Sequence, residues 1–502
     1  MVQLSTFIKK SKKELCAKDS IFKVENHDEA YYIWKKLGVK EKILLHIDAH
    51  NDMWWITNNT NITIANFICP ALNEDIVKEM IWIVPDKTWE TKENKKNILL
   101  HLKEITKTYS GNLNNIKIKE DSISTLILGK PLRVCTLSSL PTINEPILLD
   151  IDIDYFIIPQ VQYRKSDNHT EIPWCWPNEL IDSLHKKNIS PELITIAYSV
   201  EGGYTPLKWK YLGDELELRF KNENASSLRG MELIKEAATL LQNGMNQVAE
   251  KKYLEARALL QNSAAPSYHL ALLYAKMGQE SNAQKFYKET LVIDPSYRTP
   301  YNNLGPLYLS ELCLESAEQE YKKALVLDPQ DAYAYLGLGQ ITIHRKKYDE
   351  AEALLKKAID YNKYLTDAYR ALGDVYSKKG QYAEAIVSYE KSLKLALDGY
   401  KPLNDASIFT CTGKPHKKDL DHCKIHAKLA ALYAKKDSLT EAISGYRISI
   451  AGGYDDFLSR AHLSYLYLRK NKWQKAAQEF FGAVIKIPHW LLDVWTSRFE
   501  GK

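Results

Sequence analysis

A sequence unit of 34 residues recurs through the second half of the chain and constrains the fold strongly. Each unit is marked by a leucine followed by a small residue, at Leu270-Ala271, Leu304-Gly305, Leu338-Gly339 and Leu372-Gly373. Tyrosine, alanine and proline follow this pair at fixed distances. A period of this length is typical of stacked helix pairs, in which small residues allow close approach, aromatic rings fill gaps and proline ends the second helix.

The array extends beyond these four units in both directions. The pattern resumes at Leu429 and Leu463 after an irregular insertion near residues 399–424, and a weaker unit with Gly244 opens the array. We therefore expect an all-α solenoid of about seven repeats in residues 229–502. The pattern resembles the tetratricopeptide repeat family. This resemblance implies a concave surface that holds a peptide or protein, either the substrate or a separate partner.

The first half of the chain has a different pattern, in which short apolar runs alternate with longer helix-like stretches. Such alternation is typical of an α/β fold with a mostly parallel sheet between two layers of helices, whose ligands bind at the carboxyl ends of the strands. We expect this three-layer domain in residues 1–228. The apolar runs are Ile43–Ile47, Ile81–Val84, Leu132–Leu137, Ile147–Ile153 and Leu193–Tyr198.

Composition narrows the class of protein. A chain of 502 residues suggests two or more domains, and no apolar run approaches the ~20 residues that a membrane helix needs. The first residues lack the pattern of a signal peptide, so we expect a cytoplasmic protein without a membrane partner. The net charge is only +5 and lysines alternate with glutamates, which predicts no nucleic-acid partner. Seven scattered cysteines indicate reduced thiols.

Two runs of the first half place acids and a histidine at alternate positions directly after apolar stretches. Successive side chains of an extended strand point to opposite faces, so the alternate ones should converge. A buried carboxylate without a partner is costly and normally acquires a cation or a proton, whereas surface aspartates would only cap loops. The pattern therefore predicts a metal site. Its members are Asp48, His50 and Asp52 in one run and Asp150, Asp152 and Asp154 in the other.

The ligand types indicate which metal to expect. Carboxylate oxygens with imidazole nitrogens favour a hard or borderline ion, and shared carboxylates favour a pair of ions. We expect two Mn²⁺ ions. Paired ions roughly 3.5–4 Å apart lower the pKa of a bound water and supply a nucleophile near neutral pH.

The first run resembles a known motif. Asp48-Ala49-His50-Asn51-Asp52 is similar to the Asp-Ala-His-x-Asp motif of arginases, ureohydrolases with a binuclear manganese centre. The second run resembles the Asp-x-Asp strand of that family, and Val24–Ala30 supplies His27 where the family has its first metal-binding histidine. The chain looks most like the formerly uncharacterised family that contains the peptide arginases, over about residues 20–215. This resemblance implies hydrolysis of peptide-borne arginine to ornithine and urea.

The resemblance also implies roles for single residues. His27 and Asp52 would bind one manganese, His50 would bind the other, and Asp48 would bridge them and act in catalysis. Asp152 and Asp154 would complete the centre, with Asp150 either an alternative ligand or a carboxylate that orients a ligand.

Glu201 follows another apolar run in a glycine-rich turn. A carboxylate there can pair with a guanidinium in a bidentate manner, so we expect Glu201 to bind the substrate and take part in catalysis. The proton carrier has no motif, and His101 and His169 are candidates. Two other functions remain open: a different binuclear or zinc metallohydrolase, such as a deacetylase or another amidine hydrolase, and an inactive enzyme-like repeat scaffold. A single zinc ion would favour the deacetylase.

Overall fold

The computed structural model describes residues 20–486, except 54–61, 63–64, 110–112, 163–168, 201–204, 223–224, 299–308, 310–312, 398–419 and 453. The chain forms two compact units, one up to Pro329 and one from Gln330 onward. The boundary expected at residues 228–229 lies inside a helix, Ala225–Gln242. It does not coincide with the division into units, because the first repeats pack with the α/β part.

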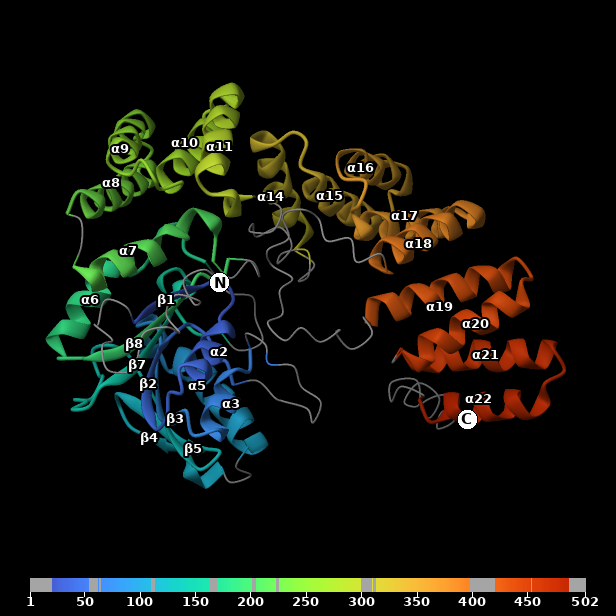
Figure 1. Ribbon diagram of the computed structural model, residues 1–502, viewed down its shortest axis with the longest axis horizontal. Coiled ribbons are helices and arrows are strands. Elements are labelled where there is room, and N and C mark those ends of the chain that lie inside the picture. The colour runs from blue at the N-terminus through green and yellow to red at the C-terminus, as the bar shows by residue number, and fades with distance from the viewer. Residues whose placement is uncertain are drawn as a thin grey trace. The chain divides into compact units, whose positions relative to one another are not determined.

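The α/β part contains an eight-stranded mixed sheet with the order β1-β8-β7-β2-β3-β6-β5-β4 (Figure 1). Neighbouring strands are parallel from β1 to β6 in this order, and β6, β5 and β4 pair in antiparallel fashion. Each of the five apolar runs overlaps a strand. The strands are β1 (Ile21–Val24), β2 (Lys42–Ile47), β3 (Val77–Ile83), β4 (Lys117–Ile118), β5 (Ser122–Ile127), β6 (Lys130–Cys135), β7 (Ile147–Asp152) and β8 (Pro191–Ala197).

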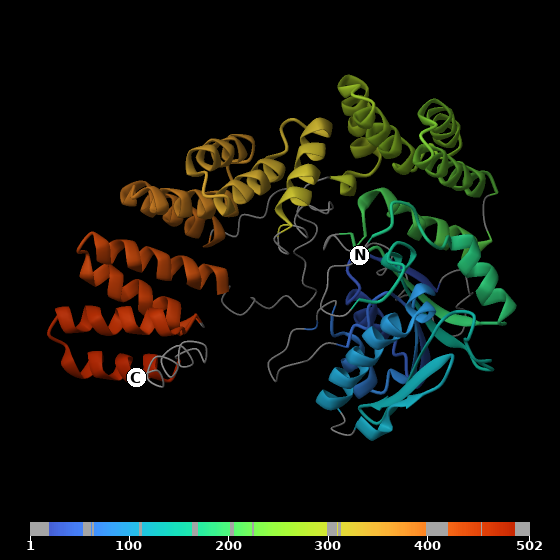
Figure 2. The same ribbon diagram turned by 180° about the vertical axis from the view of Figure 1, so that it is seen from behind.

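Helices cover both faces of the sheet, as the two opposite views show (Figures 1 and 2). Leu44 of β2 packs into one hydrophobic cluster with α2, α3 and α5, while Leu45 packs into the other with α6 and α7. Alternate residues of one strand thus reach opposite layers. These helices are α2 (Glu29–Lys36), α3 (Ile68–Asn73), α5 (Lys92–Tyr109), α6 (Pro177–Lys186) and α7 (Tyr211–Lys221), with the short α4 at Lys87–Glu90.

The second half consists of helix pairs. Most of the expected insertion near 399–424 lies outside the described residues, but its end is already helical because α19 begins at Leu420. No described helix is long and apolar enough to cross a membrane. The helices are α8 (Ala225–Gln242), α9 (Asn246–Leu259), α10 (Ala265–Lys276), α11 (Glu280–Ile293), α14 (Leu314–Leu327), α15 (Ala332–His344), α16 (Tyr348–Tyr361), α17 (Thr366–Lys379), α18 (Tyr382–Leu397), α19 (Leu420–Lys435), α20 (Leu439–Ala451), α21 (Phe457–Arg469) and α22 (Trp473–Val484).

Glycines explain the close packing within these pairs. A Cβ atom on Gly339 would lie 2.8 Å from Cδ2 of Leu355, and one on Gly373 would lie 2.7 Å from the ring of Tyr389. Both glycines, and both of their large neighbours, occupy equivalent positions of the repeat. In these two pairs a side chain in place of the glycine would force its neighbour to shift, so glycine allows the close approach of the two helices.

The first repeats share a core with the α/β part. Trp209, in the short 3-10 helix η4 (Leu207–Trp209), and Tyr211, at the start of α7, both contact the ring of His269 from α10. His269 also stacks on Tyr253 of α9, with 5.1 Å between ring centres. These four residues are 6% exposed or less. Burial of so much aromatic surface accounts for the single compact unit up to Pro329.

Candidate metal centre

The register of the central strands places three polar side chains in a row. His46 of β2 lies directly opposite Asp150 of β7, which lies opposite Thr195 of β8. All three are fully buried. Asp150 Oδ2 is 2.9 Å from His46 Nδ1, and the Thr195 hydroxyl donates a hydrogen bond to Asp150 Oδ1. The sheet thus holds this carboxylate from both sides.

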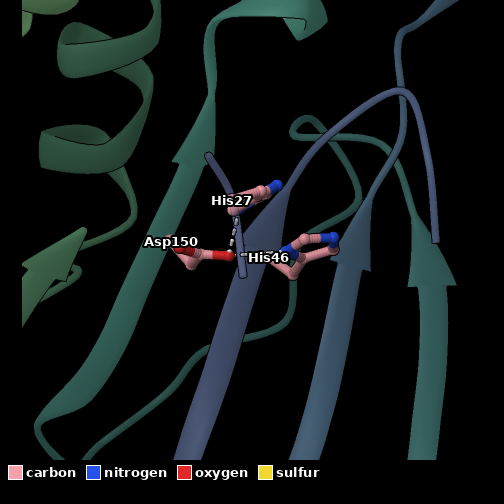
Figure 3. Close-up of side chains that lie close together, drawn as sticks. All are labelled: His27, His46 and Asp150. Atoms are coloured by element: carbon pink, nitrogen blue, oxygen red, sulfur yellow. Dashed lines mark hydrogen bonds and ion pairs between the residues drawn. The ribbon is translucent and has the colours of Figure 1, made fainter. Parts of the chain in front are cut away.

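His27 joins this row from the loop between β1 and α2. Its Nε2 lies 2.8 Å from Asp150 Oδ2, so one carboxylate oxygen contacts two imidazoles (Figure 3). When these two nitrogens donate to Asp150, the other ring nitrogens, Nδ1 of His27 and Nε2 of His46, become free to bind a metal. The ring of Phe67 lies 4.8 Å from that of His27 and shields the site from one side.

A first group of ligand atoms surrounds Nδ1 of His27. This nitrogen lies 3.0 Å from Asp52 Oδ2, 3.0 Å from Asp152 Oδ2 and 3.3 Å from Asp48 Oδ2. His46 Nε2 lies 3.2 Å from the same Asp48 oxygen. One nitrogen therefore faces three carboxylates that come from two different strand ends.

A second group forms around His50. Its Nδ1 lies 2.8 Å from Asp154 Oδ2 and 3.5 Å from Asp48 Oδ1. The ligand atoms of this trio lie within 4.8 Å of one another. Asp48 thus offers Oδ2 to the first group and Oδ1 to the second, which is the geometry of a bridging carboxylate. The side chain of His50 is 32% exposed, whereas those of Asp48 and Asp154 are 1% exposed, so the site opens to solvent at His50.

The expectation that extended strands align these residues is wrong in one respect. β2 ends at Ile47 and β7 at Asp152, before most of the acids. The Asp48 carboxylate accepts a hydrogen bond from the backbone N–H of His50 at 2.7 Å, and Asp152 accepts one from Asp154 at 3.0 Å. Aspartate side chains readily cap such turns, and these bonds bend the chain so that the acids still converge.

Several buried polar atoms of the site have no hydrogen-bond partner among the described residues. Buried polar groups in proteins are almost always hydrogen-bonded, so a concentration of exceptions calls for an explanation such as a bound ion. Imidazole nitrogens and carboxylate oxygens are the donors that Mn²⁺ and Zn²⁺ accept. The residues present therefore fit a metal centre. The atoms are His27 Nδ1, His46 Nε2, Asp48 Oδ2, Asp52 Oδ2 and Asp154 Oδ1.

The electrostatics also indicate a need for positive charge. Burial disfavours a charged His46, but the hydrogen bond to Asp150 and the contact with the Asp48 carboxylate outweigh it and raise its pKa to about 10. Burial together with the charge of Asp48 raises the pKa of Asp52 to about 6. Burial and neighbouring carboxylates raise the pKa of Asp154 well above its usual value. Each of these three shifts favours a bound proton, which indicates that excess negative charge is buried there.

Glu201 lies outside the described residues. The residues on either side of its turn are described: the Ser199 hydroxyl donates to Asp152 Oδ2 at 2.5 Å, and the Thr205 N–H donates to the Ser199 carbonyl at 3.0 Å. Ser199 has a left-handed backbone with φ of 48°, which a residue with a side chain adopts at a cost. Ser199, two positions before Glu201, therefore contacts a predicted metal ligand.

The two histidines considered as proton carriers do not join the ligand groups of the described residues. His101 on α5 has Nδ1 3.2 Å from the side-chain nitrogen of Asn51 and Nε2 2.7 Å from the Gln162 carbonyl. Asn51 also borders a cavity of about 430 Å³ that is lined by residues of α5. This cavity adjoins the loop that carries His50 and Asp52.

His46 is the one residue of these groups to which the sequence analysis gave no role. It precedes Asp48 by two positions, so the same alternation that selected Asp48 and His50 would have selected it. It lies one residue before the end of β2, inside the apolar run Ile43–Ile47. Its register with Asp150 is visible only in the folded sheet.

Comparisons with known proteins match parts of the second half. The tetratricopeptide repeat family matches residues 266–297, and the C-terminal ARM domain of tetratricopeptide repeat protein 21 matches residues 327–403. No curated protein matches the chain. The family match and the helix pairs confirm the predicted tetratricopeptide repeats.

Among solved structures, the chain is similar to YrrB, described as a TPR protein with an unusual peptide-binding site, at 21% identity over 42% of this chain and 97% of that one, with a TM-score of 0.31. The similarity to MamA has 19% identity over 37% of this chain and 95% of that one, with a TM-score of 0.30. The similarity to TTC0263 of Thermus thermophilus has 18% identity over 41% of this chain and 100% of that one, with a TM-score of 0.26.

Proposed function

We propose that the α/β part is a binuclear metal-dependent hydrolase that converts arginine side chains of a peptide to ornithine with release of urea. The observation that supports this proposal most is the pair of buried ligand groups that share Asp48. A carboxylate with one oxygen in each group is suited to hold two ions close together. The motif resemblance to arginases supports the choice of reaction.

In this proposal His27 and Asp52 would hold one Mn²⁺, His50 would hold the other, and Asp48 would contribute to both sites. Asp152 and Asp154 complete the two groups. Asp150 is then not a ligand, because its Oδ2 is engaged by two imidazoles. The ions would supply a water of lowered pKa and positive charge beside the reacting carbon.

The residues around the ions would bind and orient the substrate. Glu201 would pair with the guanidinium group, and the partly exposed His50 marks the side from which a side chain enters. The reaction adds water across the bond between the guanidinium carbon and Nε. The oxygen goes to the carbon, which leaves as urea, and a proton goes to Nε, which becomes the ornithine amine.

The repeats would bring the substrate to this site. Tetratricopeptide repeats present an extended concave surface, and a peptide or carrier protein bound there stays at high local concentration near the hydrolase. This step favours arginine within a peptide over free arginine.

The test is direct. Full-length protein loaded with Mn²⁺ is incubated with arginine-containing peptides and with free arginine, and mass spectrometry follows the conversion of arginine to ornithine while a colorimetric assay follows urea. We expect both products from a peptide and neither from Asp48→Asn protein. Absence of both products from every peptide, or recovery of one zinc ion per chain as the native metal, would contradict the proposal.

A further inference from the structure

Lys210 is a buried lysine at the junction between η4 and α7, only 7% exposed. A buried ammonium group is costly unless several partners compensate for its lost hydration. The Ser296 hydroxyl forms a hydrogen bond with Lys210 Nζ. Nζ also lies 3.6 Å from Asp294 Oδ2 and 3.9 Å from Glu25 Oε2. Carboxylates from two distant parts of the chain thus share one cation.

Two aromatic rings complete the surroundings of this ammonium group. Nζ lies 5.1 Å from the ring centre of Tyr198 and 5.6 Å from that of Tyr297. At these distances the electron-rich face of a ring attracts a cation, and more strongly when water is excluded. Lys210 is therefore held by the α/β part through Glu25 and Tyr198, and by the repeats through Tyr297.

The α/β partners of Lys210 adjoin the candidate metal ligands. Glu25 precedes His27 by two residues. Tyr198 precedes Ser199, whose hydroxyl donates to Asp152. The two segments are also joined directly, since the Ser199 N–H donates to the Glu25 carbonyl at 3.0 Å. A shift of either segment would displace one ligand of the first group.

The repeat partners of Lys210 form a firm support. Asp294 lies between α11 and the following 3-10 helix η5 (Pro295–Tyr297), which contains Ser296 and Tyr297, at the end of the segment that matches the tetratricopeptide repeat family. The Asp294 carboxylate accepts the Ser296 N–H at 2.9 Å, and the buried Tyr297 ring packs on that of Tyr268 at 5.2 Å. These contacts leave the repeat end little freedom to follow a moving loop.

We propose that Lys210 is a positioning residue for the metal centre, through which the repeat of residues 266–297 holds the segments of His27 and Asp152 in place. The inference rests on the proposed metal site. It makes the first repeats a part of the hydrolase unit as well as a binding surface.

The experiment compares Lys210→Met with Lys210→Arg in the full-length protein. We expect Lys210→Met to weaken Mn²⁺ binding by about tenfold, the usual scale for residues that support metal ligands, and to lower kcat with little change in KM. Lys210→Arg should keep most of the wild-type Mn²⁺ affinity and most of the wild-type kcat. Lys208→Met is the matched control, because this neighbouring lysine pairs with Glu171 and should leave affinity and kcat unchanged.

Two further measurements keep the test decisive. Asp294→Asn removes charge from the repeat side only, and we expect it to weaken Mn²⁺ binding in the same direction even if Lys210→Met fails to fold. Hydrogen exchange should rise in the segments of residues 24–28 and 198–200 in both variants. If both variants keep the Mn²⁺ affinity, the kcat and the hydrogen exchange of the wild-type protein, the proposed role of Lys210 is overturned. The proposed metal site would not be affected by that result. Failure of the wild-type protein to bind Mn²⁺ would instead overturn the proposed function.

Discussion

Asp150 Oδ2 lies 2.8 Å from Nε2 of His27, while Nδ1 of the same ring faces three other carboxylates. A histidine that donates one N–H to a carboxylate presents its other nitrogen as a metal donor and is held in orientation. The same Asp150 oxygen contacts His46 in the same way. One carboxylate therefore orients both buried imidazoles of the site.

Replacement of Asp150 by asparagine should weaken Mn²⁺ binding by about 10- to 100-fold without abolishing it, because the amide supports the histidines less well and does not bind the ions itself. Isothermal titration calorimetry on metal-depleted protein measures this change. Asp182→Asn, an exposed substitution on α6, is the control. Unchanged affinity in Asp150→Asn protein would refute the orienting role.

The number of bound metal ions should differ between the Asp48 and the Asp52 variants. Asp48 reaches both ligand groups, whereas Asp52 belongs to the group around His27 and His46. We expect Asp48→Asn protein to retain neither ion after dialysis and Asp52→Asn protein to retain the one near His50. Elemental analysis by inductively coupled plasma mass spectrometry counts the ions. Equal losses in the two variants would argue against a bridging Asp48.

The parts of the fold with a regular pattern were predictable from the sequence. The 34-residue period predicted the helix pairs, because every unit must bury equivalent positions such as Gly339 and Gly373. The long apolar runs predicted five strands. The strands β1 and β4 have only four and two residues, so neither stood out as an apolar run.

The sequence predicted which residues form the site better than it predicted how they are arranged. Alternation selected the acids, although turns instead of strands bring most of them together. The roles of His46 and Lys210 depend on partners far away in the sequence. Lys210 lies 86 positions from Ser296, and no local pattern indicates that a lysine at the start of a helix becomes buried there.

Replacement of Gly373 by valine should destabilise the second unit. The new side chain would collide with the ring of Tyr389, and overpacking of this kind costs roughly 1–3 kcal/mol. Lys378→Val in the same helix is exposed and should cost only about 0.5 kcal/mol through helix propensity. Urea denaturation followed by far-UV circular dichroism compares the two. Equal midpoints would show that the helices can separate to accept a side chain.

The stability of the first unit should depend on pH through His269. Burial, with a smaller effect from the charge of Lys208, lowers the pKa of this imidazole from 6.5 to about 3. The ring stacks on Tyr253 and its Nε2 lies 2.9 Å from the Lys208 carbonyl, which the neutral form satisfies as a donor. Between these two pKa values the unfolded chain binds a proton that the folded unit does not. Folding therefore loses stability as the pH falls from 6.5 towards 3, by up to about 1.4 kcal/mol per pH unit.

His269→Phe keeps an aromatic ring in the stack and removes the titrating group. Its free energy of unfolding should therefore fall less steeply than that of the wild-type protein as the pH drops below 6.5. Urea denaturation in the presence of a chelator, followed by tryptophan fluorescence, measures both slopes without interference from bound metal. The groups of the metal centre contribute equally to the two proteins, so the difference in slope reports His269 alone. Parallel curves would mean that His269 is protonated in the folded unit, where its charge would lie unpaired between the rings of Trp209 and Tyr211.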